Sequence, residues 1–175
     1  EQAYRFRGHL ADRNEILQVL SEMTKRYPII FIEDPLHEDD FEGFAEASQK
    51  LDTIVVGDDL LCTNINRIQK SISMRACTGM IYKPNQIGTV SESLDAVALL
   101  RENNMLPIPS GRAGGSVSDP TCELGVGIEA PIIKTGAPRS GERVTKINKL
   151  LRIEEEVPEI KLQDLSRVLS LHKAK

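Results

Sequence analysis

The sequence predicts an α/β fold built from repeated strand–helix units. Three charged residues, Glu33, Asp58 and Lys83, each end a short apolar run and lie 25 residues apart, at positions 33, 58 and 83. Lys134 ends another such run. The runs are apolar almost throughout, which is typical of strands buried on both faces of a parallel sheet. Because parallel strands end at a common edge, we expect these charged residues to gather there, where α/β folds and barrels place their active sites.

Five apolar runs are predicted to form the strands. They are residues 28–32, 54–57, 79–82, 106–109 and 131–133. The fourth run leads into Ser110, which keeps a similar period between Lys83 and Lys134. The sequence therefore predicts about five units of one repeating design.

The segments between these runs have the periodicity of helices. Apolar side chains recur every three or four positions, with charged side chains between them. The predicted helices are 11–26, 41–47, 65–74, 89–104 and 140–156. The acidic residues 38–40 favour a helix start, since the first turn attracts negative charge, and Thr63 with Asn64 is a capping pair. Strands that alternate with helices of this length indicate βαβ units.

The length raises a question about how the sheet closes. A closed eight-stranded barrel typically needs about 250 residues, whereas this chain has 175. We therefore expect part of a larger barrel, or a dimer that covers the open sheet edges. Residues 1–156 are predicted to form one layered unit. Residues 157–175 are predicted to be a polar tail whose apolar side chains dock as a short helix.

Composition argues against two classes of partner. The net charge is −4, no basic stripe is present, and the chain lacks tryptophan, which argues against nucleic acid. No apolar run approaches the roughly 20 residues of a membrane span. Cys62, Cys77 and Cys122 form no close pair, which favours buried thiols in a reducing cytoplasm.

Several collinear motifs carry a specific resemblance. They are residues 27–35, 38–40, 56–64, 83–89, 133–138 and 148–156, which include Ile32-Glu33-Asp34-Pro35 and Ile133-Lys134-Thr135-Gly136. In order and spacing they resemble enolase over residues 24–156. The resemblance implies that the chain is the second half of the enolase barrel domain, that a smaller amino-terminal domain precedes it, and that the protein is a cytoplasmic homodimer. It also implies the enolase reaction of glycolysis and gluconeogenesis, Mg²⁺-dependent dehydration of 2-phosphoglycerate to phosphoenolpyruvate.

The resemblance also implies roles for the charged strand ends. Glu33 and Asp58 would be magnesium ligands, because carboxylate oxygens are hard donors that suit a hard cation. Lys83 would be the general base, in line with the lysine base and magnesium of the enolase superfamily. Asp34 and Asp59 are interpreted as residues that orient these groups.

The remaining predicted site residues bind substrate. Lys134 would bind the substrate carboxylate, and Arg112 the phosphate, because a planar guanidinium matches phosphate oxygens. Ser110 begins the same loop and is predicted to bind substrate with Arg112.

This loop departs from the family pattern. Residues 110–115 read Ser-Gly-Arg-Ala-Gly-Gly where enolases have Ser-His-Arg-Ser-Gly-Glu, so a histidine, a serine and an acid are replaced. The glycine-rich run 111–118 is a candidate anion cradle of backbone N–H groups. Two alternatives follow: an enzyme of the same fold for another acid substrate, or a non-catalytic relative with a binding or structural role. The chain retains Lys83 and Lys134 as well as Glu33 and Asp58. This argues against the non-catalytic alternative.

Overall fold

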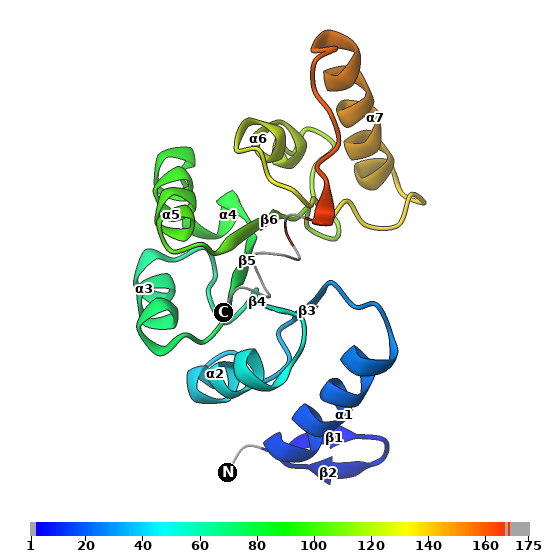
Figure 1. Ribbon diagram of the computed structural model, residues 1–175. Helices are drawn as coiled ribbons and strands as arrows, with labels where there is room; N and C mark the ends of the chain where they lie inside the picture. The colour runs from blue at the N-terminus through cyan, green and yellow to red at the C-terminus, as the bar shows by residue number, and fades with distance from the viewer. Residues whose placement is uncertain (1–2, 167, 169–175) are drawn as a thin grey trace.

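A parallel sheet of four strands is the centre of the structure, a computed structural model that describes residues 3–166 and 168. The strands are β3 (Phe31–Glu33), β4 (Ile54–Gly57), β5 (Gly79–Tyr82) and β6 (Leu106–Pro109), in this spatial order. In the register, Phe31 is opposite Ile54 and Gly79 is opposite Leu106. Spatial order equals sequence order, so the sheet is built from successive crossover units (Figure 1). The predicted α/β fold, a portion of a β/α barrel, is confirmed.

Helices connect the strands at the predicted places. They are α1 (Arg13–Arg26), α2 (Phe41–Lys50), α3 (Ile65–Met74), α5 (Val90–Glu102) and α7 (Gly141–Glu156). Predicted polar residues begin two of them: Asp40 accepts from the N–H of Gly43, and Asn64 accepts from the N–H of Arg67. These caps satisfy amides that otherwise lack a partner in the first turn.

Four short elements were not predicted. β1 (Tyr4–Phe6) and β2 (His9–Ala11) form an antiparallel hairpin, and α4 (Pro84–Ile87) and α6 (Thr121–Gly127) are brief helices. The hairpin turn places Arg7 and Gly8 at positive φ, as tight two-residue turns require. Such elements are too short for a hydrophobic period to identify.

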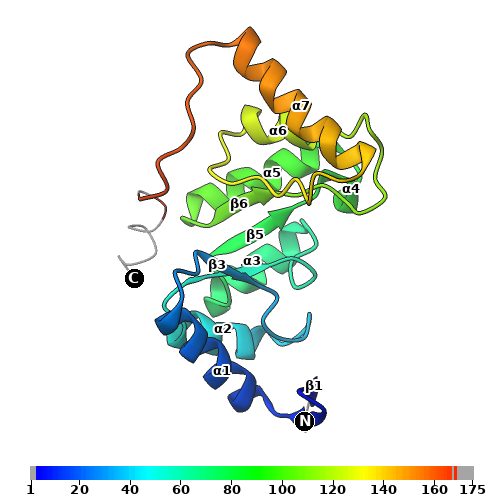
Figure 2. The same ribbon diagram turned by 90° about the vertical axis from the view of Figure 1, so that its right-hand side faces the viewer.

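Both faces of the sheet are covered by apolar side chains. One face packs on α2, α3 and α5 through Val55, Met80 and Tyr82. The other carries Ile54 and Val56 in a second cluster, whose full set of buried members is Ile54, Val56, Ile81, Ile108 and Val168. After α7 the chain returns to this second face (Figures 1 and 2). The docked tail begins a helical turn at Leu165, and residues 167 and 169–175 of the predicted tail lie outside the described residues.

The fifth predicted strand, 131–133, does not form. Only an isolated bridge joins Lys134 to Ser110. Leu106 and Ser110 donate their backbone N–H groups to the β5 side. The alternate positions, whose amides would face the next strand, are Pro107 and Pro109, which have no N–H. A regular hydrogen-bond ladder between β6 and residues 131–133 therefore cannot form. Two hydrogen bonds hold Lys134 beside β6 instead: its N–H donates to Pro109 O at 2.8 Å, and its carbonyl accepts from the N–H of Gly111 at 3.2 Å.

No helix in the described residues is both long and apolar enough to cross a bilayer.

Docking of the tail generates a stability prediction. Val168 is 5% exposed within the second cluster, whereas Leu162 in the same tail is fully exposed. Val168→Asp should lower the free energy of unfolding by about 2 to 4 kcal/mol, because a charge replaces a packed apolar side chain. Leu162→Asp is the matched control and should leave urea denaturation unchanged. Equal midpoints for the two variants would show that the tail does not stabilise the sheet.

Candidate active site

The predicted acids and lysines meet in pairs at the carboxyl edge of the sheet. Lys83, which follows β5, donates to Asp58, which follows β4, with 2.7 Å between Nζ and Oδ1. Lys134 forms an ion pair with Glu33, the last residue of β3. The side chains of Lys83 and Asp58 are 11% and 13% exposed, and those of Lys134 and Glu33 are about a third exposed. The first pair is therefore the less solvated, and its attraction is the less screened by water.

A cavity of about 420 Å³ opens beside these pairs. Five of the six predicted site residues line it: Asp58, Lys83, Ser110, Arg112 and Lys134. Glu33 is absent from the lining but contacts it through Lys134. The spacing of these residues in the sequence thus predicted side chains that share one cavity. It did not predict two further cations of the cavity wall, Arg143 and Lys146 of α7.

Asp34 holds the loop that carries Asp58. Its two carboxylate oxygens accept from the N–H groups of Asp58 and Asp59, each at 2.8 Å. Burial raises the pKa of Asp34, and the two amide hydrogen bonds partly oppose that rise. Asp34 itself has a φ of +39°, an uncommon conformation that its anchored side chain maintains. The interpretation of Asp34 as an orienting residue therefore has a geometric basis.

Thr63 fixes the backbone of Lys83. Its hydroxyl accepts from the N–H of Lys83 at 3.0 Å and donates to Gln86 Oε1 at 3.2 Å. Thr63 is fully buried and has a φ of +53°. Sequence reasoning assigned it only to a helix cap, because its partners lie 20 and more residues away and leave no local signal.

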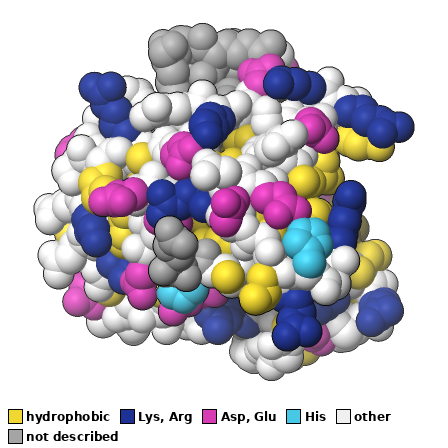
Figure 3. All heavy atoms as spheres, turned by 90° about the horizontal axis from the view of Figure 1, so that it is seen from below, with side chains coloured by type: hydrophobic (Ala, Val, Ile, Leu, Met, Phe, Trp, Pro, Cys, Tyr) yellow, Lys and Arg dark blue, Asp and Glu magenta, His cyan; other side chains and the backbone are white. Residues whose placement is uncertain are grey.

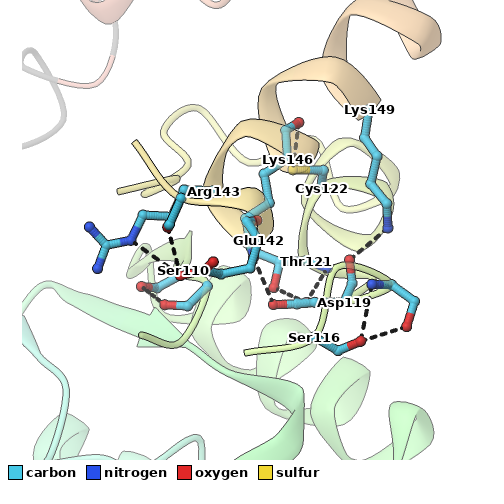
Figure 4. Close-up of polar contacts among 12 residues, drawn as sticks. Ser110, Ser116, Asp119, Thr121, Cys122, Glu142, Arg143, Lys146 and Lys149 are labelled. Carbon is cyan, nitrogen blue, oxygen red and sulfur yellow. Dashed lines mark hydrogen bonds and ion pairs between the residues drawn. The ribbon is translucent and has the colours of Figure 1, made fainter. Parts of the chain in front are cut away.

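The loop after β6 is organised around Asp119. Its carboxylate accepts from the N–H and hydroxyl of Thr121 and lies 3.3 Å from Lys146 Nζ, and Lys149 donates to its carbonyl at 2.7 Å (Figure 4). Although burial raises the pKa of Asp119, the hydrogen bonds from Thr121 and Lys146 hold it below the ordinary value. Both cations extend from α7, so this helix and the loop are held together at one acidic residue.

The predicted backbone cradle for an anion is only partly available. The N–H groups of Gly111, Gly115 and Ser118 donate to Lys134 O, Arg112 O and Ser116 Oγ respectively. Those three amides cannot also bind a ligand, so fewer backbone donors are left for an anion than the run 111–118 predicts.

The donor set fits a partly protein-bound magnesium ion. Magnesium is commonly held by one or two carboxylates together with water and substrate oxygens, and Glu33 and Asp58 supply two. In residues 3–166 and 168, no group of three or more His, Cys, Asp or Glu side chains is placed to hold a metal. The ammonium groups of Lys134 and Lys83 now provide the positive charge that a cation would bring to these carboxylates.

The charged surface in Figure 3 is mixed in sign. Lysines and arginines alternate with acids on this face and form no continuous basic stripe. This mixture of signs agrees with the small net charge of −4.

Fold and site together define a portion of a β/α-barrel domain, with an acid–lysine cavity at the carboxyl edge of its strands. The model of one family, enolase C-terminal TIM barrel domain, matches residues 7–164, and the chain belongs to this family. The predicted resemblance is thereby confirmed.

Curated relatives agree with this assignment. Proteins named enolase from Methanocaldococcus jannaschii and Methanococcus maripaludis strain S2 are each 44% identical, over 88% and 89% of this chain. An enolase from Aeropyrum pernix is 42% identical over 86%. The matched parts are 36%, 37% and 35% of those proteins, so the chain spans about a third of their length.

The Asp34 anchor can be tested by stability. Asp34→Asn replaces an acceptor oxygen by an amide donor that faces a backbone N–H, so we expect a loss of about 1 to 3 kcal/mol in the free energy of unfolding. Asp52→Asn, at an exposed aspartate in the loop between α2 and β4, is the control. If urea denaturation gives the same midpoint for both variants, the two amide hydrogen bonds contribute nothing measurable.

Asp119 should give a pH-dependent contribution to stability. Its folded-state pKa lies below the ordinary 3.8, so its stabilising effect is complete above that pH and is lost as the pH falls below it. The difference in Tm between the wild type and Asp119→Asn should therefore be constant near neutrality and narrow below about pH 4. A difference that stays constant down to pH 3 would contradict the lowered pKa.

Proposed function

We propose that the protein containing this chain is an enolase-type lyase that dehydrates 2-phosphoglycerate to phosphoenolpyruvate with Mg²⁺. The observation that carries the proposal is the convergence of Lys83, Lys134 and Asp58 on one cavity with Ser110 and Arg112. Membership of the enolase family and the names of the relatives support it. Because the chain spans about a third of those relatives, the activity is proposed for the whole protein.

Lys83 is the proposed general base. It would take the proton from the carbon next to the substrate carboxylate. The electron pair left on that carbon would form the double bond as the hydroxyl on the neighbouring carbon leaves as hydroxide, which takes up a solvent proton to give water. An ammonium cannot accept a proton, so the present ion pair of Lys83 with Asp58 has to open first, with loss of one proton from Nζ. Thr63 would keep the base in place during this change, because it binds the Lys83 backbone and not its side chain.

The other residues would bind the substrate. Lys134 is placed to bind the carboxylate, on which a second negative charge develops as the proton leaves. Arg112 and Ser110 would bind the phosphate. Glu33 and Asp58 would hold Mg²⁺, which would supply further positive charge to the developing dianion.

Further proposals concern the assembly, the compartment and the tail. We propose a homodimer in the cytoplasm that carries out this step in glycolysis and gluconeogenesis. Cys77 and Cys122 are buried thiols, whereas Cys62 is only partly buried, contrary to expectation. Burial raises the pKa of Cys77 to about 11, which makes it a poor nucleophile. We also propose that residues 1–156 form one unit and that residues 157–175 form a tail.

The altered loop favours one competing function. Gly111, Ala113 and Gly115 offer no side-chain contact beyond Cβ, so the phosphate end of the cavity differs from the family pattern. An enzyme of the same fold for another acid substrate is therefore the second candidate, and a non-catalytic binding protein is the third.

Activity of the full-length gene product decides between these functions. With Mg²⁺, the wild type should form phosphoenolpyruvate from 2-phosphoglycerate, and chelation with EDTA should abolish turnover. Lys83→Ala should lower kcat by about a hundredfold or more, the usual effect of removing a general base. Lys50→Ala, which removes only an exposed i,i+4 ion pair with Glu46, is the control and should keep full activity.

Full turnover in Lys83→Ala would refute the role of Lys83. A wild type that binds Mg²⁺ but does not turn over 2-phosphoglycerate would favour another acid substrate. A wild type that binds neither Mg²⁺ nor 2-phosphoglycerate would favour the non-catalytic alternative.

A further inference from the structure

Two glycines make room for two cations of α7 in the cavity wall. Arg143 and Lys146 lie three residues apart on this helix, hence on one side of it, and both line the cavity. A Cβ added at Gly111 would lie 2.3 Å from Lys146 Cε, and one added at Gly136 would lie 2.9 Å from Arg143 Cδ. Real Cβ atoms do not approach so closely. A side chain at position 111 would therefore force the end of Lys146 out of its present place.

Lys146 is a buried charge with few partners. It is 2% exposed, and its Nζ lies 3.3 Å from Asp119 Oδ2 and donates to Glu142 O at 3.0 Å. The distance to Asp119 is longer than the 2.7 to 2.9 Å of most charge-assisted hydrogen bonds. An ammonium has three N–H donors, and residues 3–166 and 168 provide these two acceptors. One donor is thus left for a group in the cavity that Lys146 lines.

The charge balance of the cavity identifies the ligand class at this end. Its lining includes five cations and two carboxylates, the latter being Asp58 and Asp59. Lys83 and Lys134 are compensated by ion pairs with Asp58 and Glu33. Arg143 and Lys146 have longer ion pairs, 3.8 Å to Glu142 Oε1 and 3.3 Å to Asp119 Oδ2. Positive charge is therefore least compensated at Arg112, Arg143 and Lys146. A compact anion with several acceptor oxygens, such as a phosphate group, satisfies these donors.

We propose that Lys146 binds the phosphate of the substrate, in the space that the absence of a side chain at Gly111 leaves open. The inference rests on the proposed function for the identity of the substrate. It assigns to α7 a phosphate contact that the loop residues 111, 113 and 115 cannot make with side-chain polar groups. Gly111 then has a positive role, since it admits the ammonium to the cavity.

Lys149 provides a matched control. It lies one turn further along α7 and also contacts Asp119, through the carbonyl at 2.7 Å, and Glu123 at 2.7 Å. It does not line the cavity. Lys146→Met and Lys149→Met therefore remove the same charge from the same helix, and both disturb the Asp119 loop, but only the first removes a donor from the cavity.

The test uses the full-length protein with two measurements, the KM for 2-phosphoglycerate and the Kd of inorganic phosphate by calorimetry. Lys146→Met should raise both by about tenfold to a hundredfold, the usual effect of losing a hydrogen bond from a charged donor. Lys149→Met should leave both within about twofold of the wild type. Unchanged values in a folded Lys146→Met, or equal losses in the two variants, would overturn the inference.

Gly111→Ala tests the same ammonium without removing charge. The added methyl group should displace Lys146 and weaken phosphate binding by a similar factor, while Tm changes little, because a lysine end can move without unfolding the helix. Since both changes act through one group, the double variant with Lys146→Met should bind phosphate no more weakly than Lys146→Met alone. If Lys146→Met does not fold, wild-type phosphate affinity in Gly111→Ala overturns the inference.

The two proposals fail in different ways. Phosphate binding that depends on Lys146 in a protein without turnover of 2-phosphoglycerate supports the anion site and refutes the proposed function. Turnover with a KM and phosphate Kd that are independent of Lys146 supports the function and refutes the anion site.

Discussion

The need to pair charges at the ends of buried strands is the constraint on which the site depends. Asp58 and Lys83 are only slightly exposed, and either one left alone would carry a large desolvation penalty. The attraction within their mutual ion pair offsets part of that penalty, and Glu33 and Lys134 form the corresponding pair at a more solvated position. The second pair joins the first strand of the sheet to the segment beyond the last, 101 positions away in sequence. The chemistry proposed for these residues therefore uses charges that the fold already holds in opposed pairs.

Side chains that accept hydrogen bonds from backbone amides connect the loops at this edge of the sheet to one another. Asp34 after β3 binds two amides of the loop after β4, and Thr63 from that loop binds the amide of Lys83 after β5. Each loop is thus fixed by its neighbour, as precise placement of a reacting group requires. The conformational cost is visible in the positive φ values of Asp34 and Thr63. Such conformations persist when surrounding contacts determine them, and here the contacts are the same hydrogen bonds.

The sequence predicted the sheet and its charged edge because both depend on local patterns. The buried strand Ile54–Gly57 is an apolar run, and Asp58 is simply the residue that follows it. The predicted strand 131–133 failed for a reason that its own residues do not contain, since the missing donors are Pro107 and Pro109 of its neighbour. The role of Gly111 was also not predictable from its own sequence context, because a glycine in a loop usually indicates flexibility. Its relation to Lys146 is a tertiary contact between residues 35 positions apart, at 111 and 146, and no period or motif encodes it.

The position of Lys146 also bears on how a changed loop remains compatible with a charged substrate. A donor on a short loop is placed only as well as the loop is ordered, whereas Lys146 extends from the second turn of a helix of 16 residues. Asp119 binds Lys146 on one side and is itself bound by Thr121 and Lys149. Because the lowered pKa of Asp119 keeps it ionised, this anchor is present at every physiological pH. A cation held in this way has already lost most of its rotamer freedom, so binding an anion costs it little further entropy. On this reasoning the loss of loop side chains moves anion recognition to a better-ordered element, and the loop sequence alone does not argue for loss of function.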